Sequence, residues 1–398
     1  MNRRDEVYCL RRLGGAVSPV ASCLLIACCL SAAAQSAADL KSKEKADAPN
    51  AVVPLSLRYE EPKTYPIGTK RSAILGDLRC GSDGTIFLVM IDDAAPLANE
   101  GNGSGPAVDR MHRFLVTALT PSGDVIQFAH TDIPGLRDFV PEIRYFVSPS
   151  RVYTLEFADR YDPADPAKVL GRAHLILIYD YKGAYQGAIT LEPGLNPLNI
   201  AAFPSGDVLV VSLDKLNQTT RLLVFDEAGR PVKELKLFDE DYALKLQLGA
   251  KADNSASARQ SVWTHLSVAQ WVPFGENLFM SPILGPLPLI EISENGVVRS
   301  IDAALPDNGM ISGVMESSDK VYHVIASQMT SAADANGQKP FLTPAEIDDI
   351  YPGDGTVLKR VKFARGLRPA CVGDDSYTFV SPREEDGRLQ IIRGIVVH

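Results

Sequence analysis

Three aspartates recur at every third position of the segment DRYDPADP, namely Asp159, Asp162 and Asp165. Carboxylate oxygens at such short spacing are the ligands that calcium prefers. The glycine that usually forms the tight bend of a calcium loop is absent, and Pro163 and Pro166 stiffen the segment. The segment is therefore either a metal site or a solvated acidic surface, and the missing glycine favours the surface. Calcium is the one cofactor that the sequence suggests.

The histidines do not complete a metal site. They lie far apart in the sequence, and none stands in an H-x-x-x-H or Cys–His spacing that would hold zinc. The sequence also contains no G-x-S-x-G motif, no phosphate-binding P-loop and no G-x-G-x-x-G between a strand and a helix. Nucleophilic and nucleotide chemistry are therefore unsupported, and whether the chain is an enzyme stays open.

The strands that must position any site are best defined in residues 199–237. Short runs rich in β-branched and aromatic residues alternate there with turn-forming residues, notably Pro204–Asp207 and Asp226–Gly229. The runs are Asn199–Phe203, Val208–Leu213, Arg221–Phe225 and Val232–Leu237. The segment predicts four antiparallel strands in two hairpins, which is the unit of a β-propeller blade.

The same pattern of turns recurs in six copies along residues 51–398. Repeats of this length with four strands each are typical of propellers, so we expect an all-β, six-bladed β-propeller. The sixth copy lacks its outer strand, and Val52–Tyr59 has the alternating pattern of a strand without a repeat of its own. We expect this N-terminal strand to complete the sixth blade and close the ring. Thr343–Glu346 has the residues of a helical capping box, but the repeat requires a strand at Ile347–Tyr351.

The third unit resembles the NHL-type repeat of six-bladed propellers. The likeness lies in Pro197, Ile200, Pro204–Val211 and Leu222–Gly229, and it is weaker over the rest of the chain. Those repeats usually carry an Asp and an Arg near the connection between the second and third strands, where this chain has Ser212–Gln218. The resemblance implies the fold and not an activity, because propellers include hydrolases, lyases, quinone-dependent dehydrogenases and binding scaffolds.

Insertions relative to the third unit are expected on one face of the propeller. They fall in connections between second and third strands or between blades, which leave a blade at the same end. The insertions are residues 94–111, 159–172, 238–262, 281–286 and 327–346. Long loops collected in this way are typical of a binding face, although loops in solvent also tolerate added length. A loop-rich binding face is the first candidate site.

The second candidate site is the mouth of the axial channel on the same side. Aligning the repeats places six residues in one column near the start of the inner strands, namely Asp77, Ile143, Asn199, Ala269, Ser312 and Arg368. A dry column would not favour polar side chains. Asp77, Asn199, Ser312 and Arg368 are therefore the predicted ligand-binding residues.

Two cysteines belong to the predicted propeller, Cys80 in the first blade and Cys371 in the sixth, and ring closure makes these blades neighbours. An oxidising compartment would favour a disulfide between them. Equivalent residues of adjacent blades are expected to point the same way round the ring, however, which strains such a bond. Two buried thiols are therefore the default expectation, and the disulfide is the alternative.

Residues 1–34 have the order of an export signal. Four arginines near the start precede an uncharged stretch with the apolar run Val20–Leu30 and the small residues Ser31–Ala34. This order predicts a secretory signal peptide that is cleaved after the small residues. A retained membrane anchor is one alternative, and Leu25–Cys28 also resembles a bacterial lipobox, in which the cysteine carries lipid. Residues 35–50 are predicted to be a flexible tether.

Composition limits the partners. The chain has 398 residues, 45% of them hydrophobic, and a formal net charge of −9 with no basic tract in the predicted propeller, which disfavours nucleic acid. We expect an exported propeller, secreted, periplasmic or lipid-tethered, that binds a protein, glycan or small-molecule ligand and needs no cofactor. Membrane contact is expected only through the N-terminus. The alternative is a calcium-dependent hydrolase or lactonase with its site in the axial channel near Asp77 and Asn199.

Overall fold

The computed structural model describes residues 52–66, 74–92, 113–128, 132–214, 219–236, 266–281, 289–301, 309–317, 320–329, 342–383 and 388–398. All of the strands lie within Val53–His398. The predicted export signal and tether lie outside the described residues, as do most of the predicted insertions. Within the described ranges, no helix is long and apolar enough to cross a membrane.

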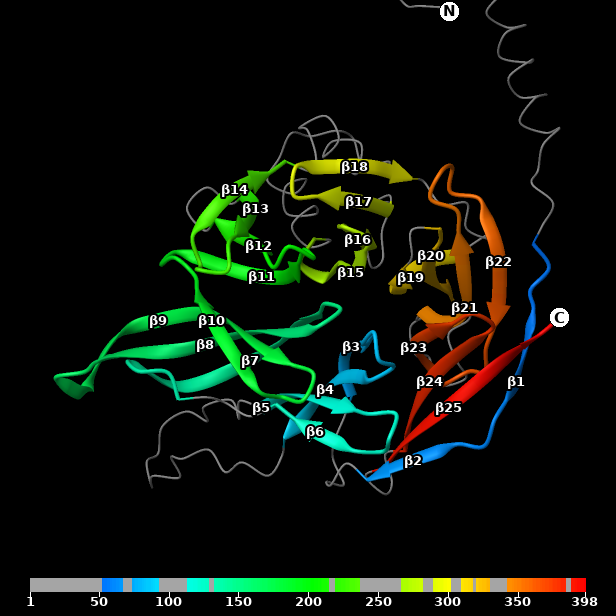
Figure 1. Ribbon diagram of the computed structural model, residues 1–398, viewed down its shortest axis with the longest axis horizontal. Helices are drawn as coiled ribbons and strands as arrows, with labels where there is room; N and C mark the ends of the chain where they lie inside the picture. Colours follow the sequence, from blue (N-terminus) through cyan, green and yellow to red (C-terminus); the bar gives the residue numbers. More distant parts are fainter. Residues whose placement is uncertain are drawn as a thin grey trace, which may run out of the picture. The chain divides into compact units, whose positions relative to one another are not determined.

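Six antiparallel sheets surround a common axis (Figure 1). Their inner strands are β3 (Ile74–Cys80), β7 (Leu136–Val147), β11 (Leu195–Ala202), β15 (Gln270–Phe274), β19 (Gly309–Ser317) and β23 (Arg368–Gly373). Each inner strand contacts the next in this order, and β23 contacts β3, so the sheets form a closed ring. The fold is therefore the six-bladed β-propeller that the repeat predicts.

Each blade continues outward from its inner strand through strands that follow one another in the sequence. The second strands are β4 (Ile86–Asp92), β8 (Arg151–Asp162), β12 (Val208–Asp214), β16 (Asn277–Ser281), β20 (Tyr322–Met329) and β24 (Ser376–Arg383). The third strands are β5 (Arg113–Leu119), β9 (Asp165–Asp180), β13 (Thr219–Phe225), β17 (Leu289–Ser293), β21 (Leu342–Ile350) and β25 (Arg388–Val397). The outer strands of the first five blades are β6 (Val125–Gln127), β10 (Tyr185–Thr190), β14 (Pro231–Leu235), β18 (Gly296–Ile301) and β22 (Val357–Lys362).

The hairpin turns form where the sequence places turn residues. In the third blade, Phe203 N–H donates to Asp207 O at 2.8 Å, and Gly206 N–H donates to Phe203 O at 3.0 Å. Gly206 has a φ of 101°, a conformation that favours glycine, and a Cβ there would meet the Glu227 carboxylate. The strands of this blade follow the predicted runs closely. Thr343–Glu346 lies within β21, so the strand predicted for the fifth blade is confirmed and the capping box forms no helix.

Burial decreases from the axis to the rim. Val208–Val211 of β12 are fully buried, whereas Pro231–Glu234 of β14 are exposed. The largest core cluster joins the second, third and fourth blades through Ile176, Phe203 and Trp271, among others. Because the apolar faces of the sheets are buried against neighbouring sheets, every blade needs a neighbour on both sides.

The two ends of the propeller share the sixth blade, as predicted. Strand β1 (Ser56–Tyr59) pairs antiparallel with the C-terminal half of β25, with Leu57 opposite Val396. A further strand that the repeat does not predict, β2 (Lys63–Pro66), pairs with the other half of β25, with Lys63 opposite Ile391. The outer strand of this blade is thus built from two consecutive pieces of the N-terminal segment.

The same segment also holds the fifth blade. Leu55 forms an isolated parallel bridge with Val361 of β22, in which Leu55 N–H donates to Arg360 O at 2.8 Å. Ala364 N–H donates to the Tyr59 hydroxyl at 2.7 Å. The N-terminal segment therefore joins the fifth and sixth blades at the rim while it closes the ring.

A disulfide joins Cys80 of β3 to Cys371 of β23, with Cα atoms 5.1 Å apart. The default expectation of two buried thiols is therefore wrong, and the alternative is found. The expectation assumed that equivalent side chains of adjacent blades cannot face each other. Close to the axis, however, the inner strands converge, and the first and last blades approach within the normal reach of a disulfide.

We expect the Cys80→Ala, Cys371→Ala double variant to lose about 2–5 kcal/mol of unfolding free energy, because the bond closes a very long loop of the unfolded chain. Urea unfolding with and without a reductant measures the loss. The reductant should lower the stability of the unaltered protein toward that of the variant and leave the variant unchanged. Equal stability of the two proteins without reductant would contradict the expectation.

Candidate functional site

Asn199, a predicted binding residue, lies on inner strand β11 and is buried. Its side-chain Nδ2 donates to Ala269 O at 2.7 Å and to Leu266 O at 3.3 Å, and its Oδ1 accepts from Ile200 N–H at 3.0 Å. The carbonyls it binds belong to the short helical turn 266–268 and the residue that precedes β15. Asn199 therefore fastens the third blade to the entry of the fourth.

The other three predicted binding residues also lie on inner strands. Ser312 Oγ accepts from Ser327 Oγ at 2.6 Å and donates to Ile325 O at 3.2 Å, so its hydroxyl is used within the fifth blade. Arg368, on β23, is half-buried. The backbone of Asp77 lies in β3, and its side chain is outside what the structure describes. The structure thus places the four residues on different inner strands and shows protein partners for Asn199 and Ser312.

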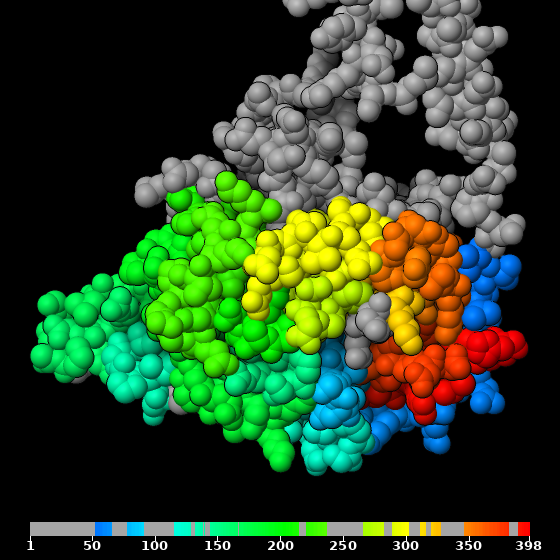
Figure 2. Space-filling model, turned by 45° about the horizontal axis from the view of Figure 1, so that its top comes forward, coloured from blue at the N-terminus to red at the C-terminus, as the bar shows by residue number. Residues whose placement is uncertain are grey.

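The segment of the three aspartates is a β-ribbon and not a loop. Strands β8 and β9 stay paired out to Asp162, which lies opposite Asp165. We call residues 157–174 the arm. Figure 1 shows β8 and β9 extending beyond the other blades, and Figure 2 shows the arm protruding from the side of the ring. The insertion predicted at 159–172 therefore projects from the propeller as regular structure.

Each of the three carboxylates has a partner within the arm. Asp159 lies 3.5 Å from Arg172 Nε, and Asp162 lies 3.3 Å from Lys168 Nζ. Asp165 Oδ1 accepts from Ala167 N–H at 3.2 Å. Among the described residues, no group of three or more His, Cys, Asp or Glu side chains could hold a metal ion. The aspartates stabilise the ribbon and its tip.

A small cleft of about 170 Å³ lies at the base of the arm, beside the connection from the second to the third blade. We call it the arm cleft. Arg160, Arg172 and His174 line it from the arm, and Leu191–Leu195 line it from the connection. The Arg172 guanidinium lies 5.0 Å from the Phe157 ring centroid, which orients it by a cation–π contact. Arg160 and Arg172 line the cleft with Glu192, and the Arg172–Asp159 pair leaves Arg160 as the main positive charge of the described lining.

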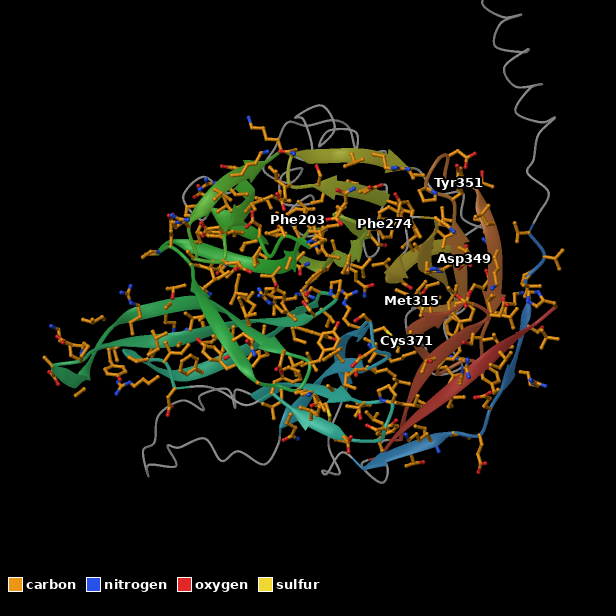
Figure 3. The ribbon with its side chains drawn as sticks, in the orientation of Figure 1. Phe203, Phe274, Met315, Asp349, Tyr351 and Cys371 are labelled. Carbon is orange, nitrogen blue, oxygen red and sulfur yellow. A yellow bond between two sulfur atoms is a disulfide. The ribbon has the colours of Figure 1, made fainter. Side chains whose placement is uncertain are left out.

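A larger cavity of about 280 Å³ lies on the axis, and we call it the axial cavity. Five of the six blades contribute to its wall, with Arg79, Val147, Val272, Met315 and Ala370 as one residue from each. Figure 3 places Met315 and Cys371 near the centre of the ring. Ser82, Pro149 and Gly275, which also line it, belong to first-hairpin turns. The cavity is therefore at the end of the axis opposite to the predicted mouth.

Buried carboxylates lie between the outer parts of the blades. Glu291 of the fourth blade accepts from Tyr322 Oη of the fifth at 3.2 Å and pairs with Arg299 Nε at 2.7 Å. Asp349 of the fifth blade accepts from Tyr377 Oη of the sixth at 3.5 Å. Burial, together with the nearby Glu291 charge, raises the pKa of Tyr322 above its ordinary value. Burial and the Asp349 charge raise the pKa of Tyr377 in the same way.

Asp349 also contacts a histidine. His323 Nδ1 lies 2.8 Å from Asp349 Oδ1 on the neighbouring strand of the same blade. Next to it, Asp348 accepts from Arg360 Nε and Nη2, both at 2.7 Å. Figure 3 places Asp349 toward the outer part of the fifth blade, away from the centre of the ring. These contacts hold strands and blades together, and no serine, threonine or cysteine nucleophile contacts His323 in any described bond.

The comparisons with known proteins concern the fold. No protein-family model matches the sequence, and no curated protein matches it. Similar solved structures include regucalcin, a calcium-binding protein from Agrobacterium tumefaciens (TM-score 0.40, 13% identity, covering 87% of this chain and 97% of that one). Virginiamycin B lyase from Staphylococcus aureus gives a TM-score of 0.38 at 11% identity, covering 85% of this chain and 100% of that one. A gluconolactonase from Xanthomonas campestris gives 0.37 at 8%, covering 87% and 98%. At this level of likeness they carry no information on activity.

Sequence reasoning missed both cavities. The arm cleft needs Arg160, Arg172 and His174 on one ribbon, and in the sequence Arg160 is separated from the other two by a segment that resembles a loop. Arg79 was a visible signal for the axial cavity. It stands one residue before Cys80 near the end of an inner strand, where the aligned positions of the other blades are apolar or aromatic.

We expect the free energy of unfolding to fall as the pH rises above about 10. The pKa of Tyr322 and of Tyr377 is higher in the folded protein than in the unfolded chain. Below the unfolded-state pKa both states keep these protons, and the stabilisation is fully present. Above it the unfolded chain ionises first, so the stabilisation is lost as the pH rises toward the folded-state pKa.

Urea unfolding over a series of alkaline pH values measures this dependence, and phenolate absorbance reports which tyrosines ionise. The matched control is the Tyr322→Phe, Tyr377→Phe variant, which should lose less stability over the same range. Ionisation of every tyrosine in the folded protein at the pKa of the free side chain would contradict the expectation.

Proposed function

We propose that this chain is an exported binding protein that holds a protein partner with its arm. The observation that carries the proposal is the arm itself, a ribbon that extends from the ring and exposes apolar side chains. Val169 is 49% exposed and Leu170 is 55% exposed. Val169 lies opposite Tyr161, and Leu170 follows it at a register shift of the ribbon. Exposed apolar side chains on a projecting element are typical of a protein-binding surface.

The charge of the arm cleft supports a partner with carboxylates. Arg160 is exposed, and Arg172 lies over Phe157 and is paired with Asp159, with 62% of its side chain exposed. The whole chain has a net charge of −9, and Asp159 and Asp162 pair with Arg172 and Lys168 of the arm, so the positive charge is confined to the cleft lining around Arg160. An acidic segment of a partner would be steered to the cleft while its apolar side chains cover Val169 or Leu170.

Export is supported by the order of residues in the first part of the chain and by the Cys80–Cys371 bond. The arginine-rich start followed by an apolar and then a small-residue run is the order of a signal peptide. Disulfides persist in oxidising compartments outside the cytoplasm. Both features support a secreted or periplasmic location, with lipid attachment at Cys28 as a variant of the same route.

Site-specific photo-crosslinking in the producing cell tests the proposal. The full chain carries p-benzoylphenylalanine in place of Leu170, or, as the matched control, in place of Val232, which is 54% exposed on outer strand β14. We expect a discrete adduct in the exported fraction from position 170 only. Arg160→Glu should reduce its yield about tenfold, because a reversed charge faces the partner's carboxylates. The same adducts from both positions, or no adduct from position 170, would contradict the proposal.

A further inference from the structure

The axial cavity is a second site with its own chemistry. It lies at the end of the axis that carries the hairpin turns, whereas the arm leaves the blades from the opposite strand ends. Its volume of about 280 Å³ equals that of about nine water molecules at roughly 30 Å³ each. A ligand of on the order of ten non-hydrogen atoms would fill it.

The wall combines apolar and polar groups, with apolar groups forming somewhat more than half of its exposed surface. Leu78, Val147, Val272, Val314 and Met315 contribute side chains from four blades. The apolar part of the wall suits a hydrocarbon or aromatic body, and the polar part suits a polar end on the same ligand.

One charged side chain interrupts this wall. Arg79 lines the cavity and is only 8% exposed, and it is the one charged residue among the described residues of the lining. The Arg79 Nε and Nη1 atoms have no exposed surface, so the two N–H groups of Nη2 are the donors through which the guanidinium would keep a protein partner and bind a carboxylate. In a site largely withdrawn from water, such a contact contributes more than the same contact at the surface.

The edge of the cavity is fixed by hydrogen bonds between the first two blades. Ser82 of the first blade donates from Oγ to Pro149 O of the second at 2.8 Å and from its backbone N–H to Tyr181 Oη at 3.4 Å. The Cys80–Cys371 bond fixes the wall on the other side of Arg79. A site with a rigid wall loses little conformational entropy when a ligand enters.

We propose that the axial cavity binds a small monocarboxylate with an apolar body, with the carboxylate on Arg79 and the body against Val272, Val314 and Met315. One cationic residue matches one carboxylate, and the apolar part of the wall matches the rest of the ligand. The site is independent of the arm, so its ligand and the partner of the arm bind at opposite ends of the ring.

Two probes with the same carbon skeleton test the proposal on the unaltered full chain. Hydrocinnamate carries the carboxylate, and hydrocinnamyl alcohol replaces it with a hydroxyl. Isothermal titration calorimetry should show hydrocinnamate binding about tenfold or more tightly than the alcohol, as expected for a charged hydrogen bond in a shielded site. In protein labelled at the methionine methyls, hydrocinnamate should shift the Met315 resonance, which Met315→Leu assigns.

Three variants locate the contact. Arg79→Met should remove the preference for the carboxylate, Arg79→Lys should keep most of it, and Met315→Trp should abolish binding of both probes by filling the cavity. Arg365→Met, at an exposed arginine outside the linings of both the axial cavity and the arm cleft, is the matched control and should leave the affinity for both probes unchanged. If Arg79→Met does not fold, the proposal is still tested on the unaltered chain, by the difference in affinity between the two probes and by the shift of the Met315 resonance.

Four results would overturn the proposal: no binding of hydrocinnamate, equal affinity for the alcohol, an unshifted Met315 resonance, or a carboxylate preference that survives in folded Arg79→Met. None of these results bears on the photo-crosslinks of the arm, so failure of this site and failure of the proposed function are distinguishable.

Discussion

The pairing of the two ends of the propeller across the sixth blade is the interaction on which the rest of the structure depends. Each blade buries apolar faces against both neighbours, so an open ring would leave two sheets exposed to water. Without the N-terminal segment, β25 would be an unpaired edge strand of the sixth sheet. Strands β1 and β2 pair with it along its length. The Cys80–Cys371 bond closes the same junction at the axis. The ring is thus fastened once at its rim and once at its centre.

Closure determines where chemistry can occur. With the inner strands held in a ring, Arg79 of the first blade and Ala370 of the sixth face the same axial cavity as Val272 of the fourth. The tyrosine–carboxylate contacts, such as Tyr322 with Glu291, fix the outer parts of successive blades. Among the strands that the structure describes, β8 and β9 extend beyond the other blades, and they form the arm (Figure 1).

The propeller fold could be predicted from the sequence because turn residues and short apolar strands alternate within each repeat. Pro204–Asp207 and Asp226–Gly229 define the third blade by short-range backbone preferences, and Val52–Tyr59 stands out as a strand without a partner. Strand β2 was not predicted because Lys63–Pro66 is too short and too polar to show the alternating pattern of a strand. The disulfide was left open because its geometry depends on how closely the inner strands converge, which no local pattern contains.

The candidate sites were much harder to predict from the sequence than the fold. Asp159, Asp162 and Asp165 follow a spacing that suits a metal, yet cross-strand pairing turns each toward a cation or an amide of the arm. Asn199 is polar in an inner strand because it binds the carbonyls of the next blade's entry, which a sequence cannot distinguish from a ligand contact. The sequence does not show that Arg79 lines a cavity, because residues from five blades form that cavity together. Function in this fold depends on contacts between distant repeats.

A cross-link between the two ends tests ring closure most directly. Leu57 lies opposite Val396 in the antiparallel pair of β1 with β25, whereas Gln390 lies six positions along β25 opposite Thr64 of β2. Mild oxidation of a Leu57→Cys, Val396→Cys protein should join the two peptides, as mass spectrometry would show, and a Leu57→Cys, Gln390→Cys protein should remain unlinked. No link in the first protein, or equal linking in both, would contradict the account.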